Sequence, residues 1–153
     1  MGTTTKVITV TSAKFSDLDK IHRLEQRCFQ FDKLSLLKYK KYIQGPAKLL
    51  VAKYKNNIIG SALILIRKNA VSCRLYSIAI DPKFRGIGAG KKLFRSVERY
   101  VKRNKYKRLN LEVNKNNVEA IQFYKSHGFV IFASYKHYYE NGEDAHRMRK
   151  NYP

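Results

Sequence analysis

A glycine-rich turn between an apolar strand and an amphipathic helix constrains this chain more than any other stretch. Residues 78–82 read Ile-Ala-Ile-Asp-Pro, as at the end of a buried strand, and residues 85–90 read Arg-Gly-Ile-Gly-Ala-Gly. A helix with one apolar stripe is predicted to follow, over about residues 88–104. The glycines let backbone N–H groups crowd together, and the helix start adds unpaired N–H groups and the positive end of its dipole. This combination predicts a phosphate-binding site.

The hydrophobic periodicity on both sides of the turn predicts a single α/β domain over residues 1–153. Ser16 and Asn116 are the expected N-caps of the first and last helices. The other expected helix covers 34–43, and strands are expected at 6–11, 48–54, 58–66, 72–80, 108–113, 129–139 and 144–150. Strands that alternate with helices in the middle of the chain, with hairpins on either side, favour a mixed sheet with helices on both faces.

The charge of the chain is unusual, because 32 Lys and Arg stand against 11 Asp and Glu, for a formal net charge of +21. Such a charge attracts RNA, ribosomes, acidic membranes or phosphorylated ligands, although a solvated basic surface is the plainer interpretation. Nonspecific attraction to RNA is therefore one expectation. We expect no membrane partner and a cytoplasmic protein, since no apolar run approaches about 20 residues and no signal peptide is seen.

The cysteines and histidines do not indicate a metal or redox centre. Cys28 and Cys73 are too few and too far apart for a metal knuckle, and core packing is the expected role of both. The four histidines lack ligand spacing, so no metal is predicted.

Two familiar phosphate-binding motifs do not fit the turn. A P-loop requires a glycine five residues before its Gly-Lys pair and a hydroxyl after it, whereas Arg85 and Lys92 occupy those places. A dinucleotide fingerprint requires Gly-x-Gly-x-x-Gly, but here the glycines alternate and Lys91 takes the place of the third. Both motifs are therefore disfavoured.

The turn resembles instead the Gln/Arg-x-x-Gly-x-Gly/Ala turn that holds the pyrophosphate of acetyl-CoA in the GNAT superfamily of N-acetyltransferases. The resemblance extends over about residues 6–150, through Leu111-Glu112-Val113, Asn117-x-x-Ala120 and Tyr124-x-x-x-Gly128-Phe129. Residues 138–145, followed by Met148, are similar to the carboxy-terminal signature of protein N-terminal acetyltransferases, particularly the ribosomal-protein alanine type. The resemblance implies the GNAT fold, a mixed, mostly antiparallel twisted sheet of about seven strands with helices on both faces.

The resemblance also implies roles for individual residues. Glu112 is the candidate general base, directly or through a water, on a strand where partial desolvation is expected to raise its pKa. Tyr124 is the candidate general acid for the leaving thiolate. A surface ion pair for Glu112 and simple packing for Tyr124 remain the alternatives. The cofactor-binding candidates are Ile78, Ala79 and Ile80 for the pantetheine arm, the turn residues Arg85, Gly86, Ile87, Gly88, Ala89, Gly90 and Lys91 for the pyrophosphate, and Asn117. The substrate-binding candidates are Phe29, Phe31, Tyr138 and Tyr139, for which packing is the alternative.

The function implied by the resemblance is direct transfer of acetyl from acetyl-CoA to a primary amine. The favoured acceptor is the N-terminal α-amine of a protein or peptide, with ribosomal proteins among the candidates, and the enzyme is expected to be a monomer or dimer. Two alternatives stay open: acetylation of a small-molecule or lysine amine, and a basic nucleic-acid- or ribosome-binding module with degenerate catalysis.

Overall fold

A seven-stranded sheet forms the centre of the computed structural model, which describes residues 7–29 and 33–153. The strand order is β1-β2-β3-β4-β5-β7-β6, and every neighbouring pair is antiparallel except β4 with β5. This architecture confirms the predicted fold. The strands are β1 (Ile8–Ser12), β2 (Ala47–Tyr54), β3 (Asn57–Ile66), β4 (Ser72–Ile80), β5 (Arg108–Asn114), β6 (Val130–Tyr135) and β7 (Ala145–Asn151).

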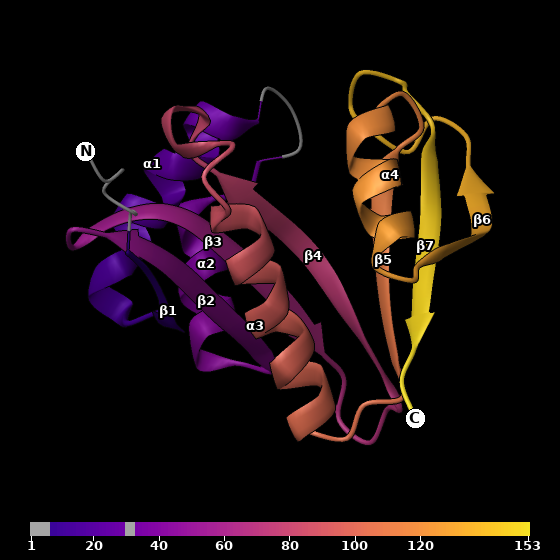
Figure 1. Ribbon diagram of the computed structural model, residues 1–153, viewed down its shortest axis with the longest axis horizontal. Helices are drawn as coiled ribbons and strands as arrows, with labels where there is room; N and C mark the ends of the chain where they lie inside the picture. Colours follow the sequence, from indigo (N-terminus) through magenta and orange to yellow (C-terminus); the bar gives the residue numbers. More distant parts are fainter. Residues whose placement is uncertain (1–6, 30–32) are drawn as a thin grey trace, which may run out of the picture.

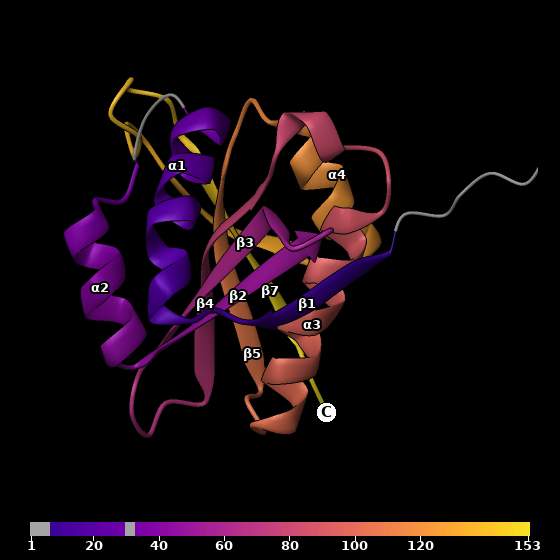
Figure 2. The ribbon, with the colours of Figure 1, turned by 90° about the vertical axis from the view of Figure 1, so that its left-hand side faces the viewer.

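Helices cover both faces of the sheet (Figure 1). They are α1 (Leu18–Cys28), α2 (Leu36–Gln44), α3 (Ala89–Arg103) and α4 (Val118–Ser126). Figure 2 shows α1 and α2 on one side of the sheet, with α3 and α4 on the other. None of the helices in the described ranges is long and apolar enough to cross a membrane.

Each face of the sheet has its own hydrophobic core. Under α1 and α2, the fully buried Ile21 and Leu24 pack with Tyr39 and the β2 residue Val51. Under α3 and α4, the fully buried Phe94 lies at the centre of a group of rings, with centroids between 5.0 and 6.0 Å from those of Phe123, Tyr124, His127 and Phe129. Ring pairs at such distances add to the stabilisation from burial alone. The α3–α4 core therefore fixes Tyr124, a residue assigned to catalysis from the sequence.

Both expected N-caps were wrong by one or more residues. The first helix begins with a 3-10 turn at Phe15–Asp17, where the Asp17 carboxylate accepts a hydrogen bond from the Lys14 N–H at 2.8 Å, so Ser16 is not the cap. At α4 the cap is Asn117, whose Oδ1 accepts from the Ala120 N–H at 3.1 Å. Neighbouring polar residues of similar capping propensity compete for such a position, and tertiary packing selects between them.

The aromatic strand predicted over residues 129–139 is shorter than expected. β6 ends at Tyr135, and Tyr138 and Tyr139 lie in the following turn, where both backbone N–H groups donate to the Glu143 carbonyl at 3.1 and 3.2 Å. The alternation of faces that a strand imposes on adjacent residues therefore does not apply to these tyrosines.

Candidate active site

The sheet splits between β4 and β5. Within the described chain these strands pair only where Ser72–Leu75 lies beside Arg108–Leu111. Beyond Leu75, β4 stays paired with β3 (Ile78 lies opposite Ala62), while β5 stays paired with β7. The two strands diverge in Figure 1, which leaves the β5-facing edge of residues 76–80 without a strand partner. Unpaired backbone groups at such an edge can hydrogen-bond an extended ligand.

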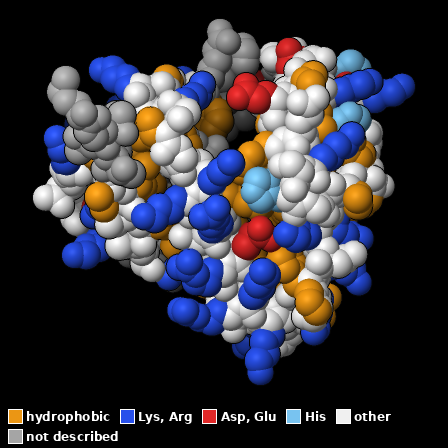
Figure 3. All heavy atoms as spheres, in the orientation of Figure 1, with side chains coloured by type: hydrophobic (Ala, Val, Ile, Leu, Met, Phe, Trp, Pro, Cys, Tyr) orange, Lys and Arg blue, Asp and Glu red, His pale blue; other side chains and the backbone are white. Residues whose placement is uncertain are grey.

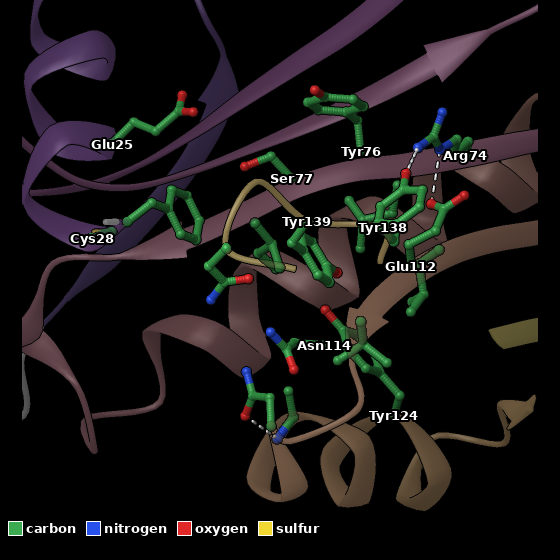
Figure 4. Close-up of a pocket in the computed structure, with 18 residues that line it drawn as sticks. Glu25, Cys28, Arg74, Tyr76, Ser77, Glu112, Asn114, Tyr124, Tyr138 and Tyr139 are labelled. Carbon is green, nitrogen blue, oxygen red and sulfur yellow. Dashed lines mark hydrogen bonds and ion pairs between the residues drawn. The ribbon is translucent and has the colours of Figure 1, made fainter. Parts of the chain in front are cut away.

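A cavity of about 560 Å³ occupies the split (Figure 4), and the space-filling view shows the surface hollowed there (Figure 3). Seven of the residues that were predicted from the sequence line it: Phe29, Ile78, Glu112, Asn117, Tyr124, Tyr138 and Tyr139. The structure therefore brings together, from α1, β4, β5, α4 and the β6–β7 turn, side chains that lie far apart in the sequence. Phe31 lies outside the described residues.

Of the predicted cofactor-binding residues, Ile78 and Asn117 line this cavity, whereas Ala79, Ile80 and the glycine turn that follows β4 do not. Gly86 and Gly88 have φ angles of +81° and +86°, which disfavour side chains, and a Cβ at either would meet nothing within 4 Å. Gly90 differs, since its φ is not positive and a Cβ there would lie 3.8 Å from the Ile80 Cγ1. Two of the three glycines are therefore required by backbone conformation, and the third is not.

The turn presents backbone amides to an open surface. Helix α3 begins at Ala89, and its first ladder hydrogen bond joins the Lys92 N–H to the Gly88 carbonyl at 3.1 Å, which leaves the preceding amides without partners inside the helix. Ala89 is buried, so its side chain faces the core, and only its backbone can serve a ligand. Such a concentration of N–H groups at a helix start suits a pyrophosphate.

Glu112 is held between two arginines. Its Oε2 accepts a hydrogen bond from the Arg74 Nε at 2.8 Å, and its Oε1 lies 3.3 Å from the Arg147 Nε. The Glu112 side chain is only 10% exposed, so it is withdrawn from solvent as expected. Its ion-pair partners come from the neighbouring strands β4 and β7. A carboxylate has about four lone-pair positions, so both oxygens keep accepting capacity toward the cavity.

Tyr124 reaches the cavity from the buried face of α4. Its ring packs against Phe94 and Phe129, and burial raises the pKa of its hydroxyl to about 12. A phenol with this pKa keeps its proton at neutral pH, so it is present as a donor. The site therefore contains a proton acceptor and a proton donor on neighbouring elements (Figure 4).

The tyrosines of the β6–β7 turn form the far wall of the cavity. The Tyr138 hydroxyl accepts from the Arg74 guanidinium at 2.9 Å, and the Tyr138 and Tyr139 rings meet edge to face with centroids 5.0 Å apart. Arg74 was not among the predicted site residues, yet it joins Glu112 to Tyr138, as the dashed lines in Figure 4 show. The alternation of β4 could have indicated it, because an arginine between buried Cys73 and Leu75 must point to the other face.

Asn117 lines the cavity, and its side chain also caps helix α4. The cap uses one of the two acceptor positions of the Asn117 Oδ1, while the amide nitrogen keeps its donors for a ligand. The cofactor contact of Asn117 stays a prediction.

Glu25 is a second carboxylate of the cavity that sequence reasoning missed. It is 2% exposed, accepts from the Leu34 N–H at 2.7 Å, and is hydrogen-bonded by the buried Tyr39 hydroxyl. Burial raises the pKa of Glu25. The helical periodicity of α1 could have indicated Glu25, because it falls four residues after Ile21 on the buried face. A charged side chain in such a place needs hydrogen-bonding partners.

Comparison with known proteins agrees with this geometry. The chain is 31% identical over 138 residues to a Bacillus subtilis (strain 168) protein curated as a candidate [ribosomal protein bS18]-alanine N-acetyltransferase, covering 89% of this chain and 90% of that one. The fold matches the crystal structure of the ribosomal-protein-S18-alanine N-acetyltransferase from Escherichia coli, with a TM-score of 0.87, 24% identity, and coverage of 95% and 94% of the two chains. It also matches Arabidopsis thaliana Naa50 in complex with a bisubstrate analogue, with a TM-score of 0.85, 22% identity, and coverage of 95% and 99%. The family model of the acetyltransferase (GNAT) family matches residues 18–129. The split sheet and the glycine turn at the start of α3 agree with this match, and the chain belongs to the acetyltransferase (GNAT) family.

Proposed function

We propose that this GNAT acetyltransferase acetylates the N-terminal α-amine of a protein, and that a ribosomal protein with N-terminal alanine is its acceptor. The observation that carries the proposal is the cavity at the β4–β5 split, where Glu112, Tyr124 and Tyr138 meet beside an open strand edge. The names of the Bacillus subtilis and Escherichia coli relatives support this acceptor.

The residues at the split fit acetyl-CoA, the acetyl donor of the family. The β5-facing edge of Ile78–Ile80 suits the extended pantetheine arm, and the amides from Arg85 to Lys91 suit the pyrophosphate, with open space above Gly86 and Gly88. When bound, acetyl-CoA supplies the acetyl group as a thioester. The Asn117 amide nitrogen is a further donor toward the cofactor.

Two protein groups move the protons of the reaction. A C–N bond forms to the acceptor nitrogen while the C–S bond of the thioester breaks. The ammonium must lose one proton to become a nucleophile and a second as the amide forms, whereas the sulfur gains one, so one proton is released overall. Glu112 accepts the first proton, directly or through a water, on a lone pair that the arginines leave available. Tyr124, which burial keeps protonated at neutral pH, supplies the proton that the sulfur gains, and the second proton of the amine restores it.

The cavity suits a cationic acceptor despite the charge of the chain. An N-terminal amine carries a positive charge at neutral pH, and the carboxylates of Glu25 and Glu112 both line the cavity. The Phe29, Tyr138 and Tyr139 rings all line the cavity, where they suit the first residues of a peptide.

An acetylation screen tests this proposal. Peptides with varied first residues should be compared with lysine peptides and polyamines, and we expect the highest kcat/KM for a peptide that begins with alanine. Preference for a polyamine or a lysine side chain would refute the assigned acceptor, and calorimetry that detects no binding of CoA or acetyl-CoA would refute the assigned donor site.

Two variants test the assigned roles. Glu112→Gln and Tyr124→Phe should each lower kcat by a factor of about 10² to 10⁴ and leave CoA affinity nearly unchanged. The matched controls are Glu119→Gln on the exposed side of α4 and Tyr100→Phe on α3, which we expect to retain wild-type turnover. Wild-type turnover in either test variant would remove that residue from catalysis.

A further inference from the structure

The exposed side of α3 and the turn that follows it form a basic face. We define this basic face by Arg95, Arg99, Lys102 and Arg103 of α3 with Lys105 and Lys107 of the turn, all of which are exposed. In Figure 3 lysine and arginine side chains gather over α3. At 100° per residue the four helical residues fall within an arc of about 100°, opposite the buried Leu93, Val97 and Val101, along about 12 Å of helix.

The basic face has almost no negative charge to offset it. Its one neighbouring acid, Glu98, already has partners outside the face: its Oε2 accepts from the Lys150 Nζ at 2.8 Å and from the Tyr152 hydroxyl at 2.5 Å. Within residues 7–29 and 33–153, no carboxylate forms an ion pair with any of the six residues that define the face. Like charges three and four residues apart on a helix repel one another, so an external anion would relieve this repulsion.

The shape of the face also suits a partner. Arg95, Arg99, Lys102 and Arg103 line an open hollow of about 610 Å³ together with Glu98. The turn adds to it, because the Lys107 N–H donates to the Val71 carbonyl at 2.7 Å and so places Lys107 beside the β3–β4 turn, which carries the exposed Arg67 and Lys68. The positive surface therefore continues past the end of the helix.

We propose that the basic face binds structured RNA through its phosphate backbone. Guanidinium groups bind phosphate oxygens in a bidentate manner, and a duplex presents a continuous series of phosphates. A membrane partner is disfavoured, because such a surface needs several large apolar side chains among its basic ones. In the described chain no large hydrophobic residue of α3 is exposed, and the adjoining β3–β4 turn adds one, Val71. The aromatic rings near these side chains (Tyr100, Tyr106 and Tyr152) are buried or half-buried and pack against the core, so contacts to phosphates rather than stacking on bases are expected.

The RNA site is separate from the catalytic cavity. None of the six defining residues lines the cavity at the β4–β5 split, and the glycine turn lies at the opposite end of α3 from Lys105 and Lys107. The inference therefore does not depend on the proposed acceptor, and its failure can be distinguished from a failure of the acetylation assay.

Fluorescence anisotropy with a labelled RNA hairpin of about 20 base pairs tests the inference. The test variant is Arg99→Gln/Lys102→Gln/Arg103→Gln, and the control is Lys20→Gln/Lys40→Gln/Lys41→Gln, three exposed lysines of α1 and α2 across the sheet. Both remove three charges. We expect the test variant to bind the hairpin at least tenfold more weakly at 100 mM KCl, and the control to change less than twofold. The slope of log K against log[KCl] should become shallower by about 2.7 in the test variant if each lost charge contacts one phosphate.

Three results would overturn the inference. Equal weakening in the two triple variants would assign the binding to net charge instead of this face. Binding of anionic vesicles or polyglutamate with the same affinity and the same loss in the test variant would assign the face to anionic surfaces in general. Loss of peptide acetylation in the test variant alone would show that the face serves catalysis.

Discussion

The buried hydrogen bond between Tyr39 and Glu25 offers the sharpest test of how the acceptor side of the cavity is built. Glu25 on α1 accepts from Tyr39 on α2 and from the Leu34 N–H between them, so it joins two helices and the segment that connects them. Tyr39→Phe removes one donor and keeps the ring, which leaves a buried carboxylate oxygen without that partner. Hydrogen bonds to charged groups contribute about 1.5–3 kcal/mol. For a domain of this size that corresponds to a fall in Tm of about 3–12 °C.

The loss should depend on pH in a defined direction. Burial raises the pKa of Glu25, so this group contributes stability that is fully present below its unfolded pKa, near 4.5, and is lost as pH rises through its folded pKa. The Tyr39 hydrogen bond acts against this rise, because it favours the ionised form. Tyr39→Phe should therefore cost more at about pH 8 than at about pH 5, because the ionised fraction of Glu25, which this hydrogen bond favours, grows as pH rises.

Thermal unfolding followed by circular dichroism at both pH values measures this difference. Tyr42→Phe is the matched control, since it lies on the same helix and its hydroxyl makes no hydrogen bond among the described residues. We also expect Tyr39→Phe to raise KM for the acceptor peptide more than KM for acetyl-CoA, because Glu25 fixes the α1–α2 segment rather than the glycine turn. A Tyr39→Phe protein that is destabilised equally at both pH values, or no more than Tyr42→Phe, would refute the reasoning.

Three further predictions concern the cofactor side and the core. Gly60→Ala places a Cβ 2.7 Å from the Ile80 Cδ1 and 3.1 Å from the Ala79 carbonyl oxygen. This substitution should therefore cost about 1–3 kcal/mol of stability and raise KM for acetyl-CoA. The control is Gly90→Ala, whose Cβ would lie 3.8 Å from its nearest neighbour and should not lower Tm. Phe94→Ala should cost about 3–5 kcal/mol in denaturant unfolding, because the fully buried ring supports Tyr124 and Phe129, and a loss below 1 kcal/mol would show that the core collapses around the gap. Comparison of wild type with Tyr124→Phe by absorbance at 295 nm should show no ionisation of Tyr124 below about pH 11, since its pKa is raised to about 12; a Tyr124 phenolate near pH 10 would contradict its burial.

The fold could be predicted largely because its main signals are local. Alternation over β4 and the apolar stripe of α3 depend on neighbours within a few residues, and β4 was predicted with its observed bounds, Ser72–Ile80. The glycine turn was likewise identifiable, since the positive φ angles of Gly86 and Gly88 require glycine. Local chemistry did not settle the caps at Ser16 and Asn116, where adjacent residues have similar propensities.

The long-range contacts of the site could not be predicted from single positions. Glu112 was identified, but its two arginine partners come from β4 and β7, whose register is set by the whole sheet. Tyr138 and Tyr139 were identified, but the turn that aims both of them at the cavity depends on backbone hydrogen bonds to Glu143. Pattern reasoning therefore found residues of the site, while the structure supplied the contacts that orient them.

A small rotation where β4 and β5 pair would be amplified at the open end of the catalytic cleft. In the described part of the chain the strands pair only along Ser72–Leu75 and Arg108–Leu111. Five further residues of β4 extend beyond that joint, a reach of about 16 Å at the usual rise of a strand. Rotation of one strand by about 5° at the joint would shift the far end by about 1.4 Å, which is enough to separate a positioned amine from a thioester. The buried Cys73 and Leu109 face each other in this joint. The width of the working cleft is therefore set by packing at its closed end, far from any atom that reacts.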